Sequence, residues 1–592
     1  MPIIRYFRFA VILVVMEICY FLSGYIFWYN HDVLNFLWSS QYSYFPSYYS
    51  NGFWIIPLLL IVPFLILEKY GTKVIVRENL IIGFLFLGSF VNAFSLWRIP
   101  EINPDMILYN SQARYVVDHS ILSFMLEFGK NYGTRGLPLP SLIFGLAYSL
   151  FGIHRYAIQL VNSILFSLIV VLGYLIAKEL FTREVGVYSG IILLSSPFMI
   201  SQAPLTSVDV ATTFFVTLSI YQLVRMMKRP GPLSSVLAAV TVFLASLCKV
   251  TSLFFLFPVL LILCVIMILR SRQRLTVLSV LVFSTTLALL VGTMTLPFYM
   301  TIANHIRRGL TGASNNPFLN IISHPVLLTG PYWVWGRITI IAIAILKSLV
   351  LSITIPVFLL ALLMLSFVFL KKDKTRIASC LLLTTWIIVP TMYTLDPSTL
   401  WGGARYMMPA YPAYAILAAS FLTIFKDKRL RRMICVSILV FSIVSAQIMY
   451  GYAWGESPSR NLMHAAETVQ PLIAQGKSIR VCFDYAAAWM SIYEPSLYPK
   501  GDPFDLSSHS LFSCIDPNDK LPHYLVLVRA RGEIFGHNYF TYTMSPEESQ
   551  FLIKNYLRIM TFEGGALEGP WVDTTVEVFI LQTSAGIVAV AN

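Results

Sequence analysis

Long apolar runs separated by short polar loops constrain the fold of this chain more than any other feature. A helix needs roughly 20 mainly apolar residues to cross a bilayer, and on that basis we expect about thirteen transmembrane helices. The runs cover residues 7–29, 52–68, 79–97, 155–177, 185–204, 207–225, 233–248, 250–269, 276–299, 338–370, 377–394, 407–425 and 432–451. Composition agrees with this prediction, because only 12% of the 592 residues are charged, against about 25% in soluble proteins. The sequence therefore indicates a polytopic α-helical membrane protein.

The basic residues gather in alternate loops between these runs, which is the bias of cytoplasmic loops in membrane proteins. They include Lys178 with Arg183, then Arg225, Lys228 and Arg229, and later Lys426, Lys428, Arg429, Arg431 and Arg432. The net charge of +13 thus reports topology, and we do not expect a nucleic-acid partner. We expect a cytoplasmic N-terminus, a retained first span and an extracytoplasmic C-terminus.

With this orientation, a long segment at 98–154 lies on the outer side of the membrane. Within it, residues 137–152 are apolar but too short and proline-rich for a span, and they favour an interfacial or re-entrant helix. Counting them as a span would invert every later loop and move the basic clusters outside.

The chain divides into a transmembrane domain at 1–454 and a small extracytoplasmic α/β domain at 455–592. In the second part, 457–475 and 545–557 have helix-start signals and helical spacing. The segments 477–484, 523–530 and 575–583 are typical of strands. Cys482 and Cys514 lie here, and either a disulfide or two free thiols fit, since sequence does not set the distance between them.

Two acids at the outer ends of apolar runs are candidates for chemistry. Asp105 stands in "NPDMILYNSQARYVV", with Tyr109 four residues later. Asp209 opens the run at 207–225. Each fits a helix N-cap, which is the structural alternative. Ionisable groups in or beside spans are nevertheless functional candidates by default.

Two cations are expected at the same outer side. Lys249 lies between the runs 233–248 and 250–269, and Arg405 precedes the run at 407–425. Lone cations of this kind often extend along lipid to the head groups. Together they offer the point charge and the bidentate donors that bind a phosphate.

Four stretches then resemble integral-membrane glycosyltransferases of the GT-C superfamily, in the branch of the aminoarabinose transferases and protein O-mannosyltransferases. They are "NPDMILYNSQARYVV", "GTRGLPLPSLIFGLAYSLFGIHRYAIQLVNSIL", "SGIILLSSPFMISQAPLTSVDVATTFFVTLSIYQLVR", and the pair "CKVTSLFFLFP" with "ARYMMPAYPAYAILAA". They span roughly 98–425 in the order that the family has. The sequence departs from the family at Met106, where the family usually has Glu, and at Gln159, where many relatives have Arg.

The resemblance implies transfer of a sugar from a polyprenyl-phosphate donor to a lipid, glycan or protein acceptor at the extracytoplasmic face of the cell membrane. We expect Asp105 to act as the catalytic base, or as an orienting carboxylate if the acceptor is already a phosphate, and Asp209 to be a second catalytic acid that positions the acceptor or sugar or assists a metal. Substrate-binding roles then fall to Tyr109, Arg114, Arg135, Lys249, Arg405 and Tyr406. Arg155 is a further candidate for the contact that Gln159 does not provide.

No cofactor is predicted with certainty, and a divalent metal stays open. Two other classes of protein compete with the enzyme. A transporter or lipid flippase predicts ionisable groups at mid-bilayer on broken helices, often in two related halves. A non-catalytic scaffold leaves the acids as helix caps and the cations as membrane anchors.

Overall fold

The structure is a computed structural model, and it describes most of the region from residue 78 onward. The described residues are 78–94, 96–97, 105–127, 138–249, 251–270, 274–310, 354–371, 374–393, 405, 407–439, 442, 459–482, 490–498, 511–515, 521–531, 544–562 and 573–582. The predicted spans at 7–29 and 52–68, and parts of those at 338–370 and 432–451, lie outside these ranges.

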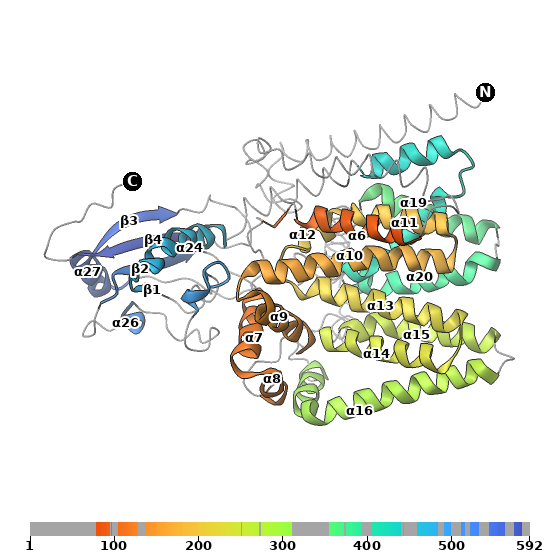
Figure 1. Cartoon of the computed structure of the whole chain (residues 1–592), viewed down its shortest axis with the longest axis horizontal. Helices are drawn as coiled ribbons and strands as arrows, with labels where there is room; N and C mark the ends of the chain where they lie inside the picture. Colours follow the sequence, from red (N-terminus) through yellow and green to blue (C-terminus); the bar gives the residue numbers. More distant parts are fainter. Residues whose placement is uncertain are drawn as a thin grey trace, which may run out of the picture.

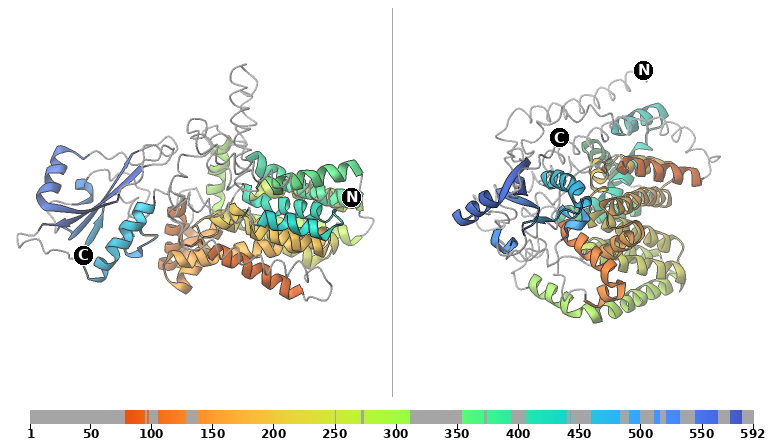
Figure 2. Two further views of the ribbon diagram at one scale, coloured as in Figure 1. Left: turned by 90° about the horizontal axis from the view of Figure 1, so that it is seen from above. Right: turned by 60° about the vertical axis from the view of Figure 1, so that its left-hand side comes forward.

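Apolar helices lie side by side in one bundle (Figures 1 and 2). They are α6 (Glu78–Phe94), α10 (Arg155–Leu180), α11 (Arg183–Leu194), α13 (Val208–Lys228), α14 (Pro232–Cys248), α15 (Thr251–Arg270), α16 (Arg274–Leu310), α19 (Ile355–Lys371), α20 (Lys374–Tyr393) and α22 (Tyr411–Leu422). Within the described residues, α10, α13 and the 275–293 part of α16 are long and apolar enough to cross a membrane. The chain is thus a polytopic helical membrane protein, as the apolar runs predict.

Helix α10 is central in the bundle and packs against α6, α11 and α13. Small residues allow the close approach of α11, since a Cβ added to Gly186 would lie 2.8 Å from the carbonyl oxygen of Tyr174. Close backbone contact through glycine is how many membrane helices associate, because lipid and apolar side chains offer similar surroundings. The absence of a side chain at Gly186 therefore allows α11 to lie close to α10.

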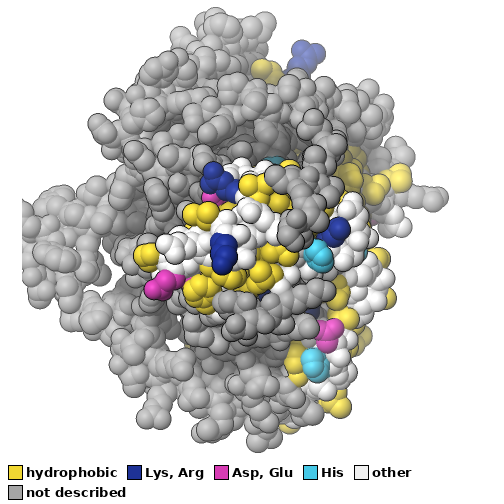
Figure 3. Space-filling model, turned by 90° about the vertical axis from the view of Figure 1, so that its left-hand side faces the viewer, with side chains coloured by type: hydrophobic (Ala, Val, Ile, Leu, Met, Phe, Trp, Pro, Cys, Tyr) yellow, Lys and Arg dark blue, Asp and Glu magenta, His cyan; other side chains and the backbone are white. Residues whose placement is uncertain are grey.

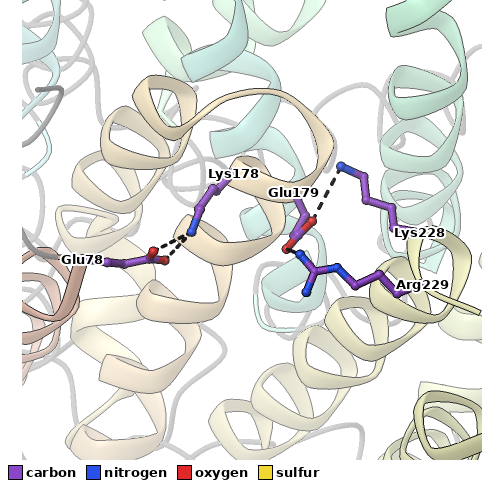
Figure 4. Close-up of polar contacts among 5 residues, drawn as sticks. All are labelled: Glu78, Lys178, Glu179, Lys228 and Arg229. Atoms are coloured by element: carbon purple, nitrogen blue, oxygen red, sulfur yellow. Dashed lines mark hydrogen bonds and ion pairs between the residues drawn. The ribbon is translucent and has the colours of Figure 1, made fainter. Parts of the chain in front are cut away.

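One end of the bundle is tied together by ion pairs (Figure 4). Lys178 pairs with Glu78 at 2.6 Å. Glu179 receives Lys228 at 3.6 Å and Arg229 at 4.0 Å. Arg431 with Glu184 makes a further pair, at 2.5 Å. The basic residues that the sequence assigns to the cytoplasmic side thus meet at one end, at the end of α10 and of α13.

The other end carries three shorter helices, α7 (Asp105–His119), α8 (Ile121–Glu127) and α9 (Pro138–Phe151). α9 corresponds to the predicted interfacial segment 137–152. Its 14 residues extend only about 21 Å, less than the roughly 30 Å of a bilayer core. α9 packs against α7 and the start of α10, so it lies beside the bundle and does not continue it.

The described residues between 459 and 581 form a mixed α/β region beside this second end (Figures 1 and 2). Its sheet has the strand order β1-β2-β4-β3, from β1 (Ile479–Val481), β2 (Tyr524–Arg531), β3 (Tyr556–Phe562) and β4 (Asp573–Leu581). β1 and β2 are parallel, and β4 runs antiparallel to both of its neighbours. Figure 3 faces this region, where apolar side chains lie among scattered basic, acidic and histidine groups.

Three helices accompany the sheet: α24 (Ser459–Ala474), the short α26 (Leu511–Cys514) and α27 (Pro546–Asn555). The segments expected as helices at 457–475 and as strands at 477–484, 523–530 and 575–583 match α24, β1, β2 and β4. The prediction that 545–557 ends as a helix is wrong at its last two residues. The chain turns at Asn555, and Tyr556 begins β3 opposite Leu581.

Cys482 and Cys514 form a disulfide, with their Cα atoms 5.4 Å apart. It joins the residue after β1 to the last residue of α26. The sequence leaves open a disulfide or two free thiols, and the structure has the disulfide.

Candidate functional site

Asp209 lies in the first turn of α13, where Ser207 is the N-cap. The Asp209 amide donates to the Ser207 hydroxyl at 3.1 Å. That hydroxyl in turn donates to Oδ2 of Asp209 at 3.0 Å. Because Ser207 takes the capping role that the sequence leaves open for Asp209, the carboxylate is available for another contact.

That contact is with Lys249, whose Nζ lies 2.8 Å from Oδ1 of Asp209. Asp209 is 4% exposed and Lys249 21%. Lys249 has an extended backbone between α14 and α15, as expected for a residue between two apolar runs. Two polar termini, of α13 and of α14, thus meet through one ion pair at the end of the bundle opposite to the pairs of Figure 4.

Arg405 adds a second positive charge that acts on the carboxylate of Asp209. It precedes the short 3-10 turn η6 (Met408–Ala410), and η6 packs against α13. The structure therefore brings together three of the predicted site residues: Asp209, Lys249 and Arg405. They are distant in sequence and come from three separate helix ends.

Tyr109 joins the same end through apolar packing. It is 6% exposed and belongs to a buried cluster with Phe144, Ile158 and Val208. Since Val208 directly precedes Asp209, this cluster holds α7 against the start of α13. Asp105 begins α7, one turn before Tyr109, and its side chain lies outside the described residues.

Arg114 has a different environment, against the C-terminal region. Its guanidinium donates to the carbonyl oxygen of Pro495 at 3.1 Å and to that of Ser491 at 3.3 Å. It also lies 4.4 Å from the centre of the Tyr498 ring. Burial lowers the pKa of Arg114, and such a group needs acceptors to compensate its lost hydration. A role in substrate binding stays a prediction for this residue.

Arg155, the first residue of α10, makes similar contacts. It donates to the carbonyl oxygen of Trp97 and lies 5.3 Å from the Tyr493 ring. It is also 3.8 Å from the sulfur of Met463. Arg114 and Arg155 thus both link the bundle end to the C-terminal region.

Arg135 and Tyr406 lie outside the described residues, and nothing here places them. Among the residues that the structure does describe, no group of three or more His, Cys, Asp or Glu side chains could hold a metal ion. Asp105 and the loops around it are not fully in that set, so the question of a metal stays open.

Sequence reasoning missed Ser207, which binds the Asp209 carboxylate, and Asn162 of α10, which binds the segment before α13. Gln159 stood out only as a departure from the family, and its amide binds the same segment. The signal was present: an amide inside an apolar run calls for a functional or structural partner. The hydrogen-bond partners of these amides could not be predicted from the sequence, because they are backbone carbonyls of a loop that is distant in sequence.

Chemically, the arrangement offers a buried carboxylate with fixed orientation and two cations at its side. A carboxylate can stabilise positive charge that develops on a sugar carbon. Cations at the same place can receive a phosphate that gains negative charge as it departs.

Comparison with known proteins agrees with this chemistry. The family profile described as dolichyl-phosphate-mannose-protein mannosyltransferase matches residues 135–298. That segment contains both Asp209 and Lys249. The resemblance to polyprenyl-phosphate-dependent glycosyltransferases is therefore confirmed over this part of the chain. No curated protein matches the sequence closely enough to count as a relative.

Solved structures with similar backbones include ArnT from Cupriavidus metallidurans, bound to undecaprenyl phosphate. It is 13% identical with a TM-score of 0.49, over 84% of this chain and 97% of that one. Another is the archaeal oligosaccharyltransferase AglB from Archaeoglobus fulgidus, in complex with an inhibitory peptide and a dolichol-phosphate. It is 12% identical with a TM-score of 0.46, over 74% of this chain and 60% of that one.

Proposed function

We propose that this protein transfers a sugar from a polyprenyl-phosphate carrier to an acceptor at the membrane surface. The single observation that carries the proposal is the family match at 135–298, which includes the ion pair of Asp209 with Lys249. The neighbouring charge of Arg405 supports the same reading. The transporter alternative finds no support in the comparisons.

The reaction breaks the bond between the sugar's anomeric carbon and the phosphate oxygen of the carrier. Its electron pair leaves with the phosphate, and an acceptor oxygen forms the new bond to the same carbon. The acceptor proton passes to a base when the acceptor is a hydroxyl. Each of these changes needs a group at a defined place.

We assign Asp105 as the base, because it begins the helix whose Tyr109 packs beside the start of α13. Asp209 faces the developing charge of the sugar or the acceptor. Lys249 and Arg405 receive the phosphate, with Tyr109 and Tyr406 as hydrogen-bond partners. Arg114 and Arg135 are candidates for further substrate contacts, and a divalent metal is a candidate cofactor that Asp209 would assist.

In topology, the proposal places this end of the bundle outside the cytoplasm, in a cell membrane with about thirteen spans. The transmembrane domain is 1–454, and the C-terminal domain, 455–592, is extracytoplasmic. Two observations support this orientation. The basic loops meet at the opposite end, and the C-terminal region carries a disulfide, which is typical of oxidising compartments.

The test is transfer of a radiolabelled sugar in membranes, with a panel of hexosyl and pentosyl polyprenyl-phosphate donors and with lipid, glycan and protein acceptors. A chelator arm decides on metal dependence. Product formation that requires one donor would identify the sugar. Membranes that accumulate donor inside vesicles without forming any covalent product would instead favour a transporter.

A charge variant links the activity to the site. We expect Lys249→Met to lower kcat on the order of 10²–10³-fold, as for loss of one preorganised charge partner. Lys178→Met is the matched control, because Lys178 likewise pairs with a carboxylate, that of Glu78 at 2.6 Å, but at the opposite end of the bundle. Equal activity of the two variants would exclude Lys249 from the site.

A further inference from the structure

Helix α10 carries two buried amide side chains near its start. Gln159 and Asn162 are both 0% exposed, one turn apart on a helix that is otherwise mainly apolar. Polar groups in a membrane-spanning helix are costly unless they are hydrogen-bonded, and they mark functional places by default. Their partners therefore indicate what they do.

Both amides bind backbone carbonyls of the segment that leads into α13. Gln159 donates to the carbonyl oxygen of Pro204 at 2.8 Å and to that of Trp97, also at 2.8 Å. Asn162 donates to the carbonyl oxygens of Leu205 at 2.6 Å and Ser207 at 3.3 Å. Helix α10 thus holds this loop at three carbonyl oxygens, those of Pro204, Leu205 and Ser207.

The held loop is short and ends at the site. It follows α12 (Pro197–Gln202), and α13 begins at Val208. Ser207 is its last residue, and the Ser207 hydroxyl exchanges hydrogen bonds with both the amide and the carboxylate of Asp209. The path from Asn162 to the Asp209 carboxylate therefore runs through one residue.

Elsewhere in the bundle, another buried amide side chain binds a backbone carbonyl that is not part of this loop. Asn92 of α6 is 1% exposed and donates to the carbonyl oxygen of Leu194 at 2.8 Å. That carbonyl ends α11 and has no described contact with Asp209. Asn92 thus offers a buried amide of matched type that does not orient the site.

We propose that Gln159 and Asn162 are positioning residues, which fix the Ser207 turn and thereby the carboxylate of Asp209. The inference rests on the proposed function, because it concerns the same site. It gives α10 a task beyond spanning the membrane. The departure from the family at Gln159 then places there a side chain that holds backbone.

The first experiment compares Asn162→Ala with Asn92→Ala in the full-length protein. Each change removes one buried amide, so similar losses of thermal stability are expected. We expect Asn162→Ala to lower kcat on the order of 10–100-fold with little change in the KM for the donor, since small misplacement of a reacting group has effects of this size. Asn92→Ala should keep both constants.

The second experiment is a double-mutant cycle with Asp209→Asn. If Asn162 acts through Asp209, adding Asn162→Ala to Asp209→Asn lowers kcat no further. Full additivity of the two changes would overturn the proposal. Gln159→Met repeats the cycle with a side chain of similar length that lacks the amide, in case Asn162→Ala does not fold.

These experiments distinguish failure of the proposed function from failure of the positioning role. Wild-type transfer by Asp209→Asn would remove Asp209 from the proposed function. A large loss for Asp209→Asn together with additive effects of Asn162→Ala would leave that function intact and sink only the positioning role. Equal losses of kcat in Asn162→Ala and Asn92→Ala would do the same.

Discussion

At the scale of single residues, the arrangement around Asp209 shows how one carboxylate is kept ionic in an apolar setting. Ser207 and Lys249 each bind one of its two oxygens. A buried charge without such partners would be strongly destabilising. In the proposed function, this pairing would provide the preorganised charges that electrostatic catalysis needs.

Asp105 carries the most direct prediction at this scale. Asp105→Asn keeps the size of the side chain and removes its basicity. We expect a loss of transfer activity on the order of 10²–10⁴-fold, the range for removal of a general base. Initial rates of transfer by the purified variant measure it.

Asp118→Asn is the control for that change, because Asp118 is an exposed acid on the same helix α7. The control should transfer at the wild-type rate. If Asp105→Asn also did so, the assignment of the base would be wrong.

The candidate residues were predictable to different degrees. Asp209, Lys249 and Arg405 stood out as ionisable groups at the ends of apolar runs, and the structure brings these three together. Ser207 and Asn162 did not stand out, and Gln159 stood out only as a departure from the family. Serine and amide side chains are common, and their role depends on which carbonyls or amides lie opposite in the folded chain.

At the scale of elements, close helix contacts make a stability prediction. In Gly186→Ala, the new Cβ would lie 2.8 Å from a backbone oxygen of Tyr174 in the neighbouring helix α10. Backbone atoms cannot move aside as a side chain can. We expect a loss of about 1–3 kcal/mol in stability, as for overpacking, measured by thermal or denaturant unfolding in detergent.

Gly83→Ala is the matched control, since a Cβ on Gly83 of α6 meets nothing within 4 Å. Alanine is the better helix former by about 1 kcal/mol. Unchanged or higher stability is therefore expected there. A Gly186→Ala protein as stable as wild type would show that α10 and α11 are not held at this distance.

Strand β3 makes a prediction about pH. Burial raises the pKa of Tyr556 to about 12, and its hydroxyl donates to the carbonyl oxygen of Pro522 at 3.2 Å. The folded state therefore favours the neutral phenol. This contribution is fully present below about pH 10, the pKa of an unfolded tyrosine, and is lost as pH rises through about 12.

Tyr556→Phe should flatten the fall in stability between pH 10 and 12, because it removes the group that titrates. Thermal unfolding of the two proteins across that window gives the comparison, with the difference between them isolating Tyr556 from other titrating groups. Parallel curves for the two proteins would contradict the prediction.

The elements themselves were readable where one pattern dominates. Apolar runs predicted most of the described bundle helices, although the run at 185–204 is divided into α11 and α12, and strand-type segments predicted β1, β2 and β4. The boundary between α27 and β3 was not readable, because Leu552 and Tyr556 continue the helical spacing. The pairing of Tyr556 with Leu581 sets the point where α27 ends and β3 begins, and these two residues are distant in sequence.

At the scale of the whole molecule, the two ends of the bundle differ in chemistry, and this predicts orientation. Single cysteines at Glu547 of α27 and at Arg229, which ends α13 and is largely exposed, serve as probes. In intact cells, a membrane-impermeant maleimide should label the position at 547. The position at 229 should react only after permeabilisation.

The native free cysteines of the described residues, Cys248, Cys264, Cys380 and Cys435, are buried or partly buried, which keeps the background low. Labelling at 229 in intact cells, with 547 protected, would invert the proposed topology.

The hydrogen bonds from Arg114 to the carbonyl oxygens of Ser491 and Pro495 have a consequence for expressing the protein as fragments. A fragment that stops near residue 454 would keep the guanidinium of Arg114 but lose the two carbonyl oxygens that accept its hydrogen bonds. If the C-terminal region were supplied as a separate polypeptide, it would have to bind so that its carbonyl oxygens again accept hydrogen bonds from Arg114. We therefore expect a fragment that ends near residue 454 to be less stable than the full-length protein, although the sequence presents the two parts as separate domains.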